Sequence, residues 1–419
     1  MKMIPKPITK HLKRSKELFQ IIYPMRDVIE KLSVQPYFFC FDYQEEWRII
    51  TWAKEDHNAQ NTIKNQDVLP TKKTNHFSSQ MPFSSGWIGA IPYDTSTKEL
   101  QAYYCSSSLS YHYPSQTWHF YGSEEEEKDL LSLLEKSIPK RTLKPHISFT
   151  PSMSKDEYIS KVQKIKEEIA RGNVYQINLS YRIGPFEISK PASLWHDLVA
   201  QNPSRHAFFW QTPSETILCN SPELFFRTKD NCIESIPIKG TNPNIHVAKN
   251  HSDLWLSPKE EAELTMIVDM MRNDFGRICQ AGSIFVEGRK IRRCGDLLHA
   301  EQRIMGQTPP HSTTKMILDA CFPAASITGT PKIAALKLIN DLENVSRRWY
   351  TGSLGFISEH DGLSEWNVCI RCILVQRDEG YIHVGAGIVH DSNPENEWLE
   401  TQAKAKAIQE SLLTCQNID

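Results

Sequence analysis

The chain has 419 residues and a net charge of -2, and 23% of its residues are charged. This near-neutral balance argues against a protein that binds nucleic acid or a membrane surface, because such proteins usually carry an excess of basic residues. The length exceeds that of one ordinary domain of roughly 100 to 200 residues. We therefore expect one large unit or two fused units, acting on a small partner.

The first 135 or so residues predict strands and turns, followed by an acidic run at 124–127. This run is either a binding tail or the first turn of a helix. The helix is favoured because Ser123 and Glu126 form a capping box and four leucines supply a buried face. The leucines are Leu130, Leu131, Leu133 and Leu134.

Residues 137–154 are rich in proline, serine and lysine, which is typical of a linker. We place a boundary there, between an N-terminal part at 1–140 and a second part at 150–419. A helix is predicted to follow, with Ser154 and Glu157 as a capping box and Gly172 as its end. Its apolar stripe is Tyr158, Val162, Ile165 and Ile169.

Strands are predicted beyond this helix at 174–183, 215–227, 352–358, 367–376 and 381–390, and helices are predicted to begin near Ser257, Pro331 and Pro394. Many of these strands follow one another without a crossover helix, which favours antiparallel pairing. The predicted fold class is α+β with mostly antiparallel sheet.

The cysteines and the start of the chain indicate a cytoplasmic protein. No apolar run approaches the roughly 18 residues that span a bilayer, and the basic start lacks an apolar signal segment. The ten cysteines are scattered, as expected of reduced thiols. Cys369 and Cys372 lie in one predicted strand, where positions three apart face opposite sides, which disfavours a shared metal ion.

The stretch IESIPIKGTNP at 233–243 predicts a strand that ends in a lysine. Ile236 and Ile238 share one apolar face, Lys239 points the other way, and the glycine that follows ends the strand. Lys239 is either a solvated strand-end residue or an amine directed into a cleft. In a cleft, burial or a neighbouring cation would lower its pKa and make it a nucleophile.

Two predicted helices begin with proline and then carry two glutamates three positions apart, which places each pair on one helix face. The pairs are Glu260 with Glu263 and Glu397 with Glu400. Single members have structural explanations, since Glu260 can cap its helix and Glu400 can pair with Lys404. Two such pairs together suggest Mg²⁺, which binds through few carboxylates and often through an anionic substrate.

Two glycine-containing segments suit an anion. Thr328 and Gly329 lead into a helix that begins at Pro331, where unpaired amides and the helix dipole attract a carboxylate. The segment from Gly385 to Gly387 allows a ligand to approach the backbone closely, although the same pattern is equally typical of a β-bulge.

Six motifs then occur in order: SPELFF, PIKGT, AELTMIVDMMRNDFGRI, SITGTPK, YTGSLGF and GAGIVHDSNPENEWLET. Together they resemble the chorismate-utilising enzymes, and among them the aminodeoxychorismate synthases. The resemblance runs from about Ser154 to the last residue and extends weakly to 86–94. It implies two packed sheets with helices outside, and it makes 150–419 a chorismate-binding catalytic domain in one globule with the N-terminal part.

The resemblance gathers most of the candidate residues into one site. It implies that Mg²⁺ is held, directly or through water, by Glu260, Glu263, Glu397 and Glu400 and grips the ring carboxylate of chorismate. The residues implied to bind the substrate are Gln176, Thr241, Thr328, Tyr350, Arg371, Gly385, Ala386, Gly387 and Lys404. His299 is implied as a catalytic residue near the ring, although a lone histidine is more often structural.

The resemblance also gives Lys239 a role. In the family mechanism the lysine amine adds at C2 as the C4 hydroxyl leaves, and ammonia then adds at C4 and expels the lysine. Hydroxide is a poor leaving group, and Glu223 matches the acid that assists it. Anthranilate synthases usually carry alanine in place of Lys239, and isochorismate synthases carry a lysine in place of Gln176 to activate water, which an amide cannot do.

The expected activity is therefore a synthase of 4-aminobenzoate and folate biosynthesis. No amidotransferase motif surrounds the cysteines, so ammonia is expected from solution or from a separate glutamine amidotransferase subunit. The alternatives are anthranilate synthase component I and a non-catalytic chorismate-binding subunit. Asn244 stands where the family usually has arginine, and Ala324 and Ala325 stand where glycines are common, so substrate grip or loop geometry can differ.

Overall fold

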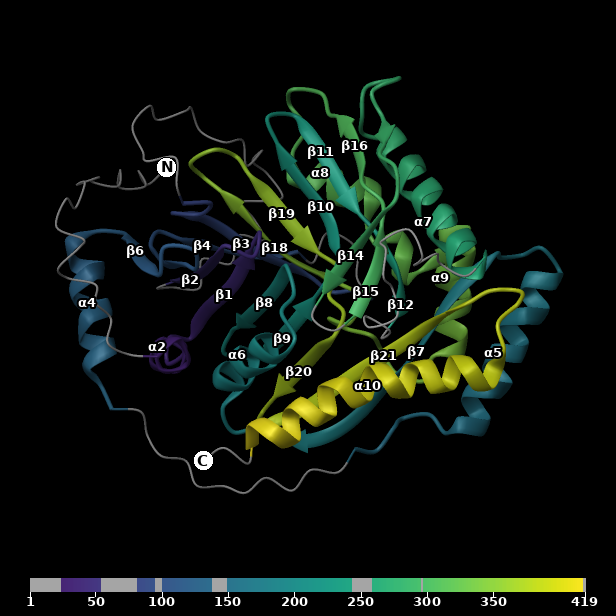
Figure 1. Ribbon diagram of the computed structural model, residues 1–419, viewed down its shortest axis with the longest axis horizontal. Helices are drawn as coiled ribbons and strands as arrows, with labels where there is room; N and C mark the ends of the chain where they lie inside the picture. The colour runs from purple at the N-terminus through teal and green to yellow at the C-terminus, as the bar shows by residue number, and fades with distance from the viewer. Residues whose placement is uncertain are drawn as a thin grey trace, which may run out of the picture.

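A computed structural model of the chain describes residues 24–53, 81–94, 100–137, 149–242, 258–294 and 297–416. Within these residues the strands form three sheets, and their neighbours pair antiparallel. Helices lie outside the sheets (Figure 1). The predicted α+β class is confirmed. Among the described helices, none combines the length and apolar character that a bilayer crossing requires.

The largest sheet takes strands from both ends of the chain. Its ten described strands, in pairing order, are β17 (Gly329–Thr330), β7 (Gln176–Glu187), β21 (Glu379–Ile388), β20 (Cys372–Gln376), β9 (Thr216–Ser221), β8 (His206–Gln211), β1 (Tyr37–Tyr43), β2 (Trp47–Ala53), β5 (Ser108–His112) and β6 (Thr117–Tyr121). The pairing of β1 with β8 joins the N-terminal part to the rest. The boundary at 140–150 stays a prediction, since 138–148 lie outside the described residues.

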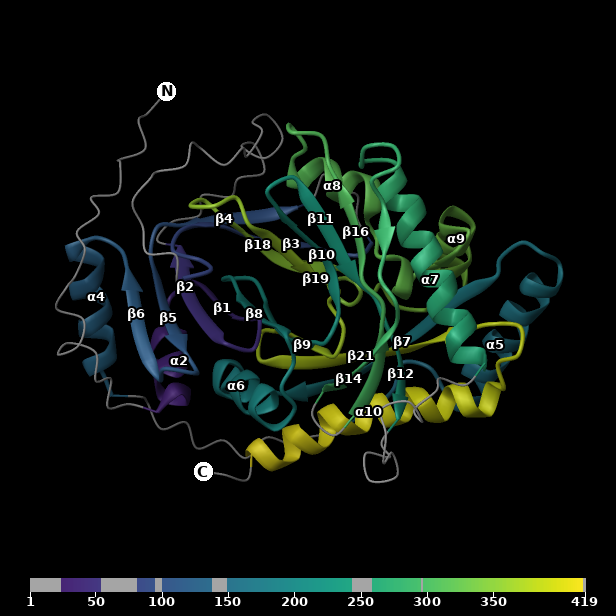
Figure 2. The same ribbon diagram turned by 45° about the horizontal axis from the view of Figure 1, so that its top comes forward.

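The other two sheets are smaller. The second has eight described strands, in the order β13 (Phe285–Val286), β16 (Ile304–Gln307), β11 (Cys232–Ile236), β10 (Leu224–Lys229), β19 (Ser364–Asn367), β18 (Ser353–Ser358), β3 (Gly86–Ile91) and β4 (Gln101–Cys105). The third has three described strands, in the order β12 (Ile238–Asn242), β15 (Leu297–Glu301) and β14 (Lys290–Cys294). Figure 2 shows β12 between α7 (Pro258–Gly276) and α10 (Pro394–Gln416).

The remaining α-helices lie outside the sheets (Figure 1), whereas the short 3₁₀ helix is buried. They are α2 (Met25–Leu32), α4 (Glu124–Glu135), α5 (Lys155–Ala170), α6 (Pro191–Gln201), α8 (Thr314–Cys321), α9 (Lys332–Leu342) and the short 3₁₀ helix η3 (Ala325–Ile327). Ser123 and Glu126 form the predicted capping box of α4, where Leu130 and Leu134 are buried. α9 begins one residue later than predicted, because Pro331 is its N-cap.

Two predicted strands are each divided between two sheets. Pro222 and Glu223 separate β9 from β10, and the turn at 368–371 separates β19 from β20. In that turn Arg371 has a φ of 51°, a left-handed conformation that ends a strand. The expectation that Cys369 and Cys372 face opposite sides of one strand is therefore wrong. Cys369 lies in the turn, and its carbonyl accepts a hydrogen bond from Cys372 Sγ at 3.8 Å.

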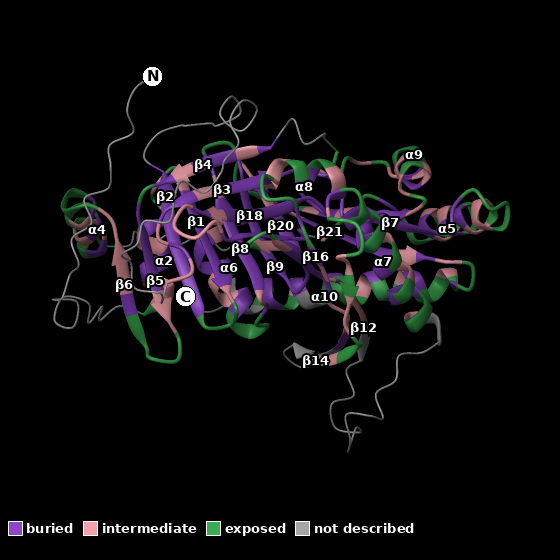
Figure 3. Cartoon of the chain, turned by 90° about the horizontal axis from the view of Figure 1, so that it is seen from above, coloured by how far each residue is buried: buried purple, intermediate pink, exposed green. Residues whose placement is uncertain are grey.

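The alternation of side chains along the strands produces two hydrophobic cores. Phe41 of β1 stacks on Phe356 of β18, with 4.7 Å between ring centroids, in the core between the two large sheets. Phe38 and Phe209 point the other way, to the core under the helices, as the two-residue period of a strand requires. Figure 3 shows buried residues along the sheets and exposed residues on the outer sides of α4, α7 and α9.

Candidate active site

Lys239 lies where β12, α7 and β21 meet. Its Nζ is 3.1 Å from Glu263 Oε2 of α7 and 3.4 Å from the place where a Cβ would stand on Gly387 of β21. The prediction that Lys239 ends its strand is wrong. The break comes earlier, at Pro237 between β11 and β12, and β12 continues to Asn242. A side chain on Gly387 would crowd the amine, so the glycine leaves room beside it.

The charge of Lys239 differs from the sequence-based expectation. Burial favours the neutral amine, but the carboxylates of Glu263, Glu400 and Glu223 outweigh burial, so the pKa of Lys239 is raised above its ordinary value. The prediction of a lowered pKa is wrong in this arrangement. The sequence could not indicate this, because the three acids come from three segments that only the fold brings together.

Glu223 sits at the crossing between the two large sheets and is 5% exposed. Burial raises its pKa to about 7, although the neighbouring Ser326 hydroxyl and the charge of Lys239 both act to lower it. A carboxyl group with this pKa is substantially protonated near neutral pH. Glu223 can therefore donate a proton, which an ordinary exposed glutamate cannot do at that pH.

Gln176, at the start of β7, faces the same region. Its side chain is 1% exposed, and both polar atoms of its amide lack a hydrogen-bond partner among the described residues. Its Nε2 is 3.1 Å from the Cβ position of Gly387. A buried amide without a partner costs about 1–3 kcal/mol. The amide is therefore available to a ligand group placed beside Lys239.

The segment from Gly385 to Gly387 is regular strand, and the alternative of a bulge there is excluded. Gly385, Ala386 and Gly387 pair in register with Ser180, Leu179 and Asn178, and the register shift of β21 lies earlier, between Gly380 and Ile382. Lys404 Nζ of α10 donates to the carbonyl of Gly385 at 2.9 Å. The Tyr350 hydroxyl lies 3.1 Å from the Cβ position of the same glycine.

The other predicted substrate-binding residues surround this centre or lie beside it. Thr328 is buried at the end of η3, and its Oγ1 donates to the carbonyl of Ala324 at 2.9 Å. Arg371 is half-buried in the turn before β20. Thr241 belongs to β12, but its side chain lies outside the described residues.

Three further predictions concern residues at the edge of the site. His299 is buried in β15, opposite Arg292 of β14. Ala324 and Ala325, which replace the usual glycines, are both buried at the start of η3. Asn244 lies outside the described residues. The catalytic role of His299 and the effects of these departures stay predictions.

The four predicted metal ligands come from the first two turns of α7 and α10. They are Glu260, Glu263, Glu397 and Glu400. Glu263 and Glu397 are buried, while Glu400 pairs with Lys404 at 2.7 Å. Among the described residues, no three acidic, histidine or cysteine side chains are close enough together to hold a metal ion. The donor chemistry nevertheless fits Mg²⁺, which keeps several waters and needs few protein carboxylates.

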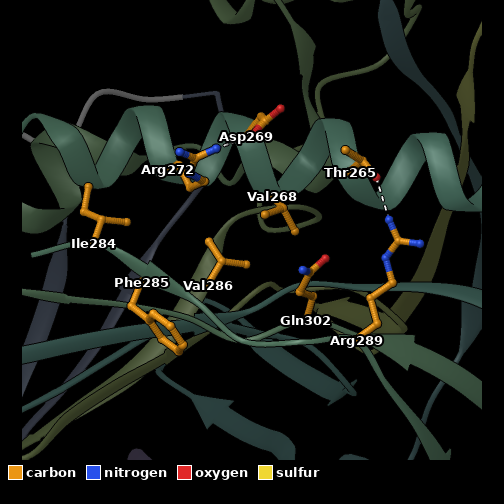
Figure 4. Close-up of a pocket in the computed structure, with 9 residues that line it drawn as sticks. All are labelled: Thr265, Val268, Asp269, Arg272, Ile284, Phe285, Val286, Arg289 and Gln302. Atoms are coloured by element: carbon orange, nitrogen blue, oxygen red, sulfur yellow. Dashed lines mark hydrogen bonds and ion pairs between the residues drawn. The ribbon is translucent and has the colours of Figure 1, made fainter. Parts of the chain in front are cut away.

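A groove of about 390 Å³ lies on another face of α7 (Figure 4). Its described lining contains none of the predicted site residues. Thr265 and Arg289 line it, and Arg289 bonds both Thr265 at 2.7 Å and Glu261 at 2.5 Å. Residues two apart on a helix point in different directions, so Thr265 faces the groove while Glu263 faces Lys239. We therefore place the chemistry at Lys239.

With this geometry in view, comparison with known proteins identifies the family. The sequence matches the chorismate binding enzyme family over residues 33–410. The chain belongs to this family. The fold and the motifs from SPELFF to GAGIVHDS are accordingly those of a chorismate-utilising enzyme, as the sequence predicted.

Individual relatives include more than one activity. The chain is 34% identical over 309 residues to "Aminodeoxychorismate synthase component 1" of Bacillus subtilis, covering 70% of this chain and 66% of the relative. It is 34% identical over 271 residues to "Anthranilate synthase component 1" of Saccharolobus solfataricus, covering 63% and 64%. In both cases the match spans slightly less than two thirds of the relative's length.

The architecture also matches a solved structure of the family. The crystal structure of anthranilate synthase component I from Streptococcus pneumoniae superposes with a TM-score of 0.71 at 26% identity, covering 89% of this chain and 90% of that chain. The two large sheets of this chorismate binding enzyme therefore belong to a known scaffold.

Three residues near the site of this chorismate binding enzyme were not predicted from its sequence. Ser326 lies beside Glu223, and its place within the SITGTPK motif could have revealed it. Arg347 and His383 are buried behind Tyr350. No local pattern marks these two, because their role depends on contacts between segments far apart in the sequence.

Proposed function

We propose that this chain is the synthase subunit that converts chorismate and ammonia to 4-amino-4-deoxychorismate. The observation that carries the proposal is the position of Lys239. Its largely buried amine lies beside Gly387 and Gln176 in a chorismate binding enzyme, at a position where the anthranilate synthases usually have alanine. The name of the Bacillus subtilis relative supports the same activity.

In the proposed reaction the Lys239 amine forms a bond to C2 of chorismate while the C4 oxygen departs as water. Before attack the Lys239 ammonium must lose a proton, and Glu263 Oε2, 3.1 Å away, is placed to hold it. Ammonia then forms a bond to C4, the ring double bonds shift back, and the electron pair of the C2–N bond stays on the lysine nitrogen as that bond breaks. The new C4 ammonium loses one proton, which balances the proton that the departing lysine nitrogen takes up. The amine is regenerated, and the net change exchanges hydroxyl for amine at C4.

Glu223 supplies the proton that the departing C4 hydroxyl needs, because its raised pKa keeps the carboxyl group partly protonated. Tyr350, Lys404 and Arg371 would orient the carboxylates of the substrate. When Mg²⁺ is bound, the glutamates of α7 and α10 would hold it, and it would supply positive charge for the ring carboxylate.

The product of the purified chain tests the proposal directly. Chorismate, Mg²⁺ and ammonium are supplied together, and the products are separated and identified by mass. We expect 4-amino-4-deoxychorismate without release of pyruvate. Anthranilate together with pyruvate would assign the chain to the anthranilate synthases, and unchanged chorismate that nevertheless binds would indicate a non-catalytic subunit.

We predict that synthesis by this chain alone depends on ammonium and not on glutamine. The relatives named component 1 imply a second component, which would be a glutamine amidotransferase. High ammonium should therefore support turnover, and glutamine should not, until an amidotransferase subunit is added. Measured release of glutamate from glutamine by the purified single chain would contradict this expectation.

We predict opposite effects of Glu223→Gln on activity and stability. Turnover should fall by about a hundredfold, because the departing hydroxyl loses its acid. The raised pKa of Glu223 means that the protonated form stabilises the fold at low pH and that this contribution is lost as pH rises through about 7. Glu223→Gln should therefore be about 3 kcal/mol more stable than wild type at pH 8, with no difference in stability at pH 4.

Denaturant unfolding at the two pH values checks this prediction. Glu234→Gln is a matched control, because Glu234 is also buried but bonds Arg227 at 2.7 Å and Arg303. That variant should lose stability at pH 8. A loss of stability at pH 8 in Glu223→Gln equal to that of Glu234→Gln would contradict the raised pKa of Glu223, and unchanged turnover would contradict its role as the acid.

A further inference from the structure

A chain of buried polar side chains lies behind Tyr350. Arg347 donates from Nε and Nη2 to Glu343 at 2.8 and 2.7 Å. The same carboxylate accepts two bonds from Ser180, from its backbone nitrogen and its Oγ, both at 2.8 Å. Ser180 Oγ is 3.3 Å from His383 Nε2. We call Arg347, Glu343, Ser180 and His383 the Tyr350 support.

His383, the last member of the Tyr350 support, makes an aromatic contact with Tyr350. The rings of His383 and Tyr350 are stacked, with centroids 4.5 Å apart and an angle of 2° between the ring planes. His383 precedes Gly385 by two residues in β21, so both face the same side of the strand. The imidazole holds the phenol ring, and the missing side chain of Gly385 leaves space for the phenol hydroxyl, 3.1 Å from its Cβ position.

The hydrogen bonds determine the state of His383. The Oγ proton of Ser180 is donated to Glu343, so His383 Nε2 must be the donor in its contact with Ser180. Burial and the positive charges of Arg347 and Arg182 hold the pKa of His383 well below its ordinary value. Tyr350 therefore stacks on a neutral imidazole of fixed tautomer and fixed orientation.

Arg347 connects this support to the rest of the site. It is 2% exposed and donates to the carbonyl of Asn178 at 2.6 Å and to the carbonyl of Ile327 at 2.9 Å. Asn178 follows Gln176 by two residues in β7, and Ile327 precedes Thr328. The guanidinium therefore fixes the backbone close to Gln176 and Thr328, which are both predicted to bind the substrate. Arg347 itself lies three residues before Tyr350, a third predicted substrate-binding residue.

We propose that His383 is a positioning residue that sets the ring plane of Tyr350 so that its hydroxyl meets a carboxylate of the substrate. This inference rests on the proposed function, in which Tyr350 contacts chorismate. His383 does not touch the substrate itself. It acts through the stacked ring, and the bonds of Ser180, Glu343 and Arg347 hold the imidazole in place.

The test compares His383→Ala, Tyr350→Phe and the double variant, with chorismate affinity by calorimetry and steady-state kinetics as readouts. Tyr350→Phe should weaken chorismate binding by about 10- to 100-fold, as loss of a charge-assisted hydrogen bond does. His383→Ala should raise KM by about three- to tenfold and leave kcat nearly unchanged, as loss of one stacked ring pair does. In the Tyr350→Phe background His383→Ala should have no further effect on KM.

Two further variants separate positioning from stability. His383→Phe keeps a ring for Tyr350 to stack on and should restore KM toward the wild-type value. His206→Ala removes another buried histidine, whose Nδ1 is 2.8 Å from Glu365, and should lower the melting temperature without raising KM. Additive effects of His383→Ala and Tyr350→Phe, or an unchanged KM in a folded His383→Ala chain, would overturn the inference. A wild-type chain that does not bind chorismate would instead overturn the proposed function.

Discussion

Lys239→Arg should lose turnover by about a thousandfold or more and still bind chorismate. Arginine keeps the positive charge that pairs with Glu263, but its guanidinium does not deprotonate and so cannot act as the nucleophile. Lys239→Ala should lose turnover to a similar extent at moderate ammonium, with some activity at very high ammonium if ammonia attacks C4 directly. Initial rates over a range of ammonium concentrations measure both effects.

The effect of Lys239→Ala on turnover must be compared with that of Lys239→Arg. Removing Lys239 leaves Glu263 as a buried carboxylate without its 3.1 Å partner, which destabilises the fold independently of catalysis. Lys229→Ala serves as a control, because Lys229 is half-exposed and pairs with Asp361 at 3.0 Å. It should have wild-type rates. Wild-type turnover by Lys239→Arg would show that Lys239 is not the nucleophile and has only a structural role.

Glu397→Gln and Glu263→Gln should each abolish measurable turnover while the chain remains folded. If the glutamates of α7 and α10 share Mg²⁺, the loss of one carboxylate removes a ligand from a site with few protein ligands. The glutamine side chain has nearly the same shape as the glutamate side chain that it replaces. It also relieves repulsion between like charges, so the fold should survive. Turnover and Mg²⁺ affinity by calorimetry, measured on the same preparations, check this prediction.

Glu397→Gln is the more informative of the two variants, because Glu263 also contacts Lys239. Glu261→Gln provides a matched control on α7, since Glu261 is exposed and bonds Arg289. It should leave Mg²⁺ binding unchanged. Normal activity of Glu263→Gln and Glu397→Gln at limiting Mg²⁺ would leave the glutamates with only capping and ion-pairing roles.

Most of the fold could be predicted from local patterns. The capping box at Ser123 and Glu126 predicted α4, and the direct succession of strands predicted antiparallel sheet. The breaks at Pro222 and Arg371 were not predicted, because an apolar run looks the same whether it stays in one sheet or crosses to another. Whether the two halves of such a run belong to one sheet or to two is decided by the fold, and the local sequence pattern does not indicate it.

The candidate site also has features that could be predicted from the sequence and features that could not. The resemblance predicted Lys239, Glu223 and Gln176 in one site. The structure places Lys239 and Gln176 beside Gly387 and Glu223 close enough to Lys239 to raise the pKa of the lysine. The raised pKa of Lys239 could not be predicted, because it depends on acids from distant segments. His383 was also missed, since its stacking partner lies 33 positions earlier in the chain.

The central claim is that the Lys239 amine forms a bond to the substrate ring, and peptide mass spectrometry of quenched enzyme tests it most directly. The purified chain is mixed with chorismate and Mg²⁺ without ammonia, quenched, digested and analysed. We expect the peptide that contains Lys239 to gain the mass of chorismate less one water, and to lose it when ammonium is added before the quench. An adduct on a different residue, or none at all in a chain that makes 4-amino-4-deoxychorismate when ammonium is present, would contradict the account.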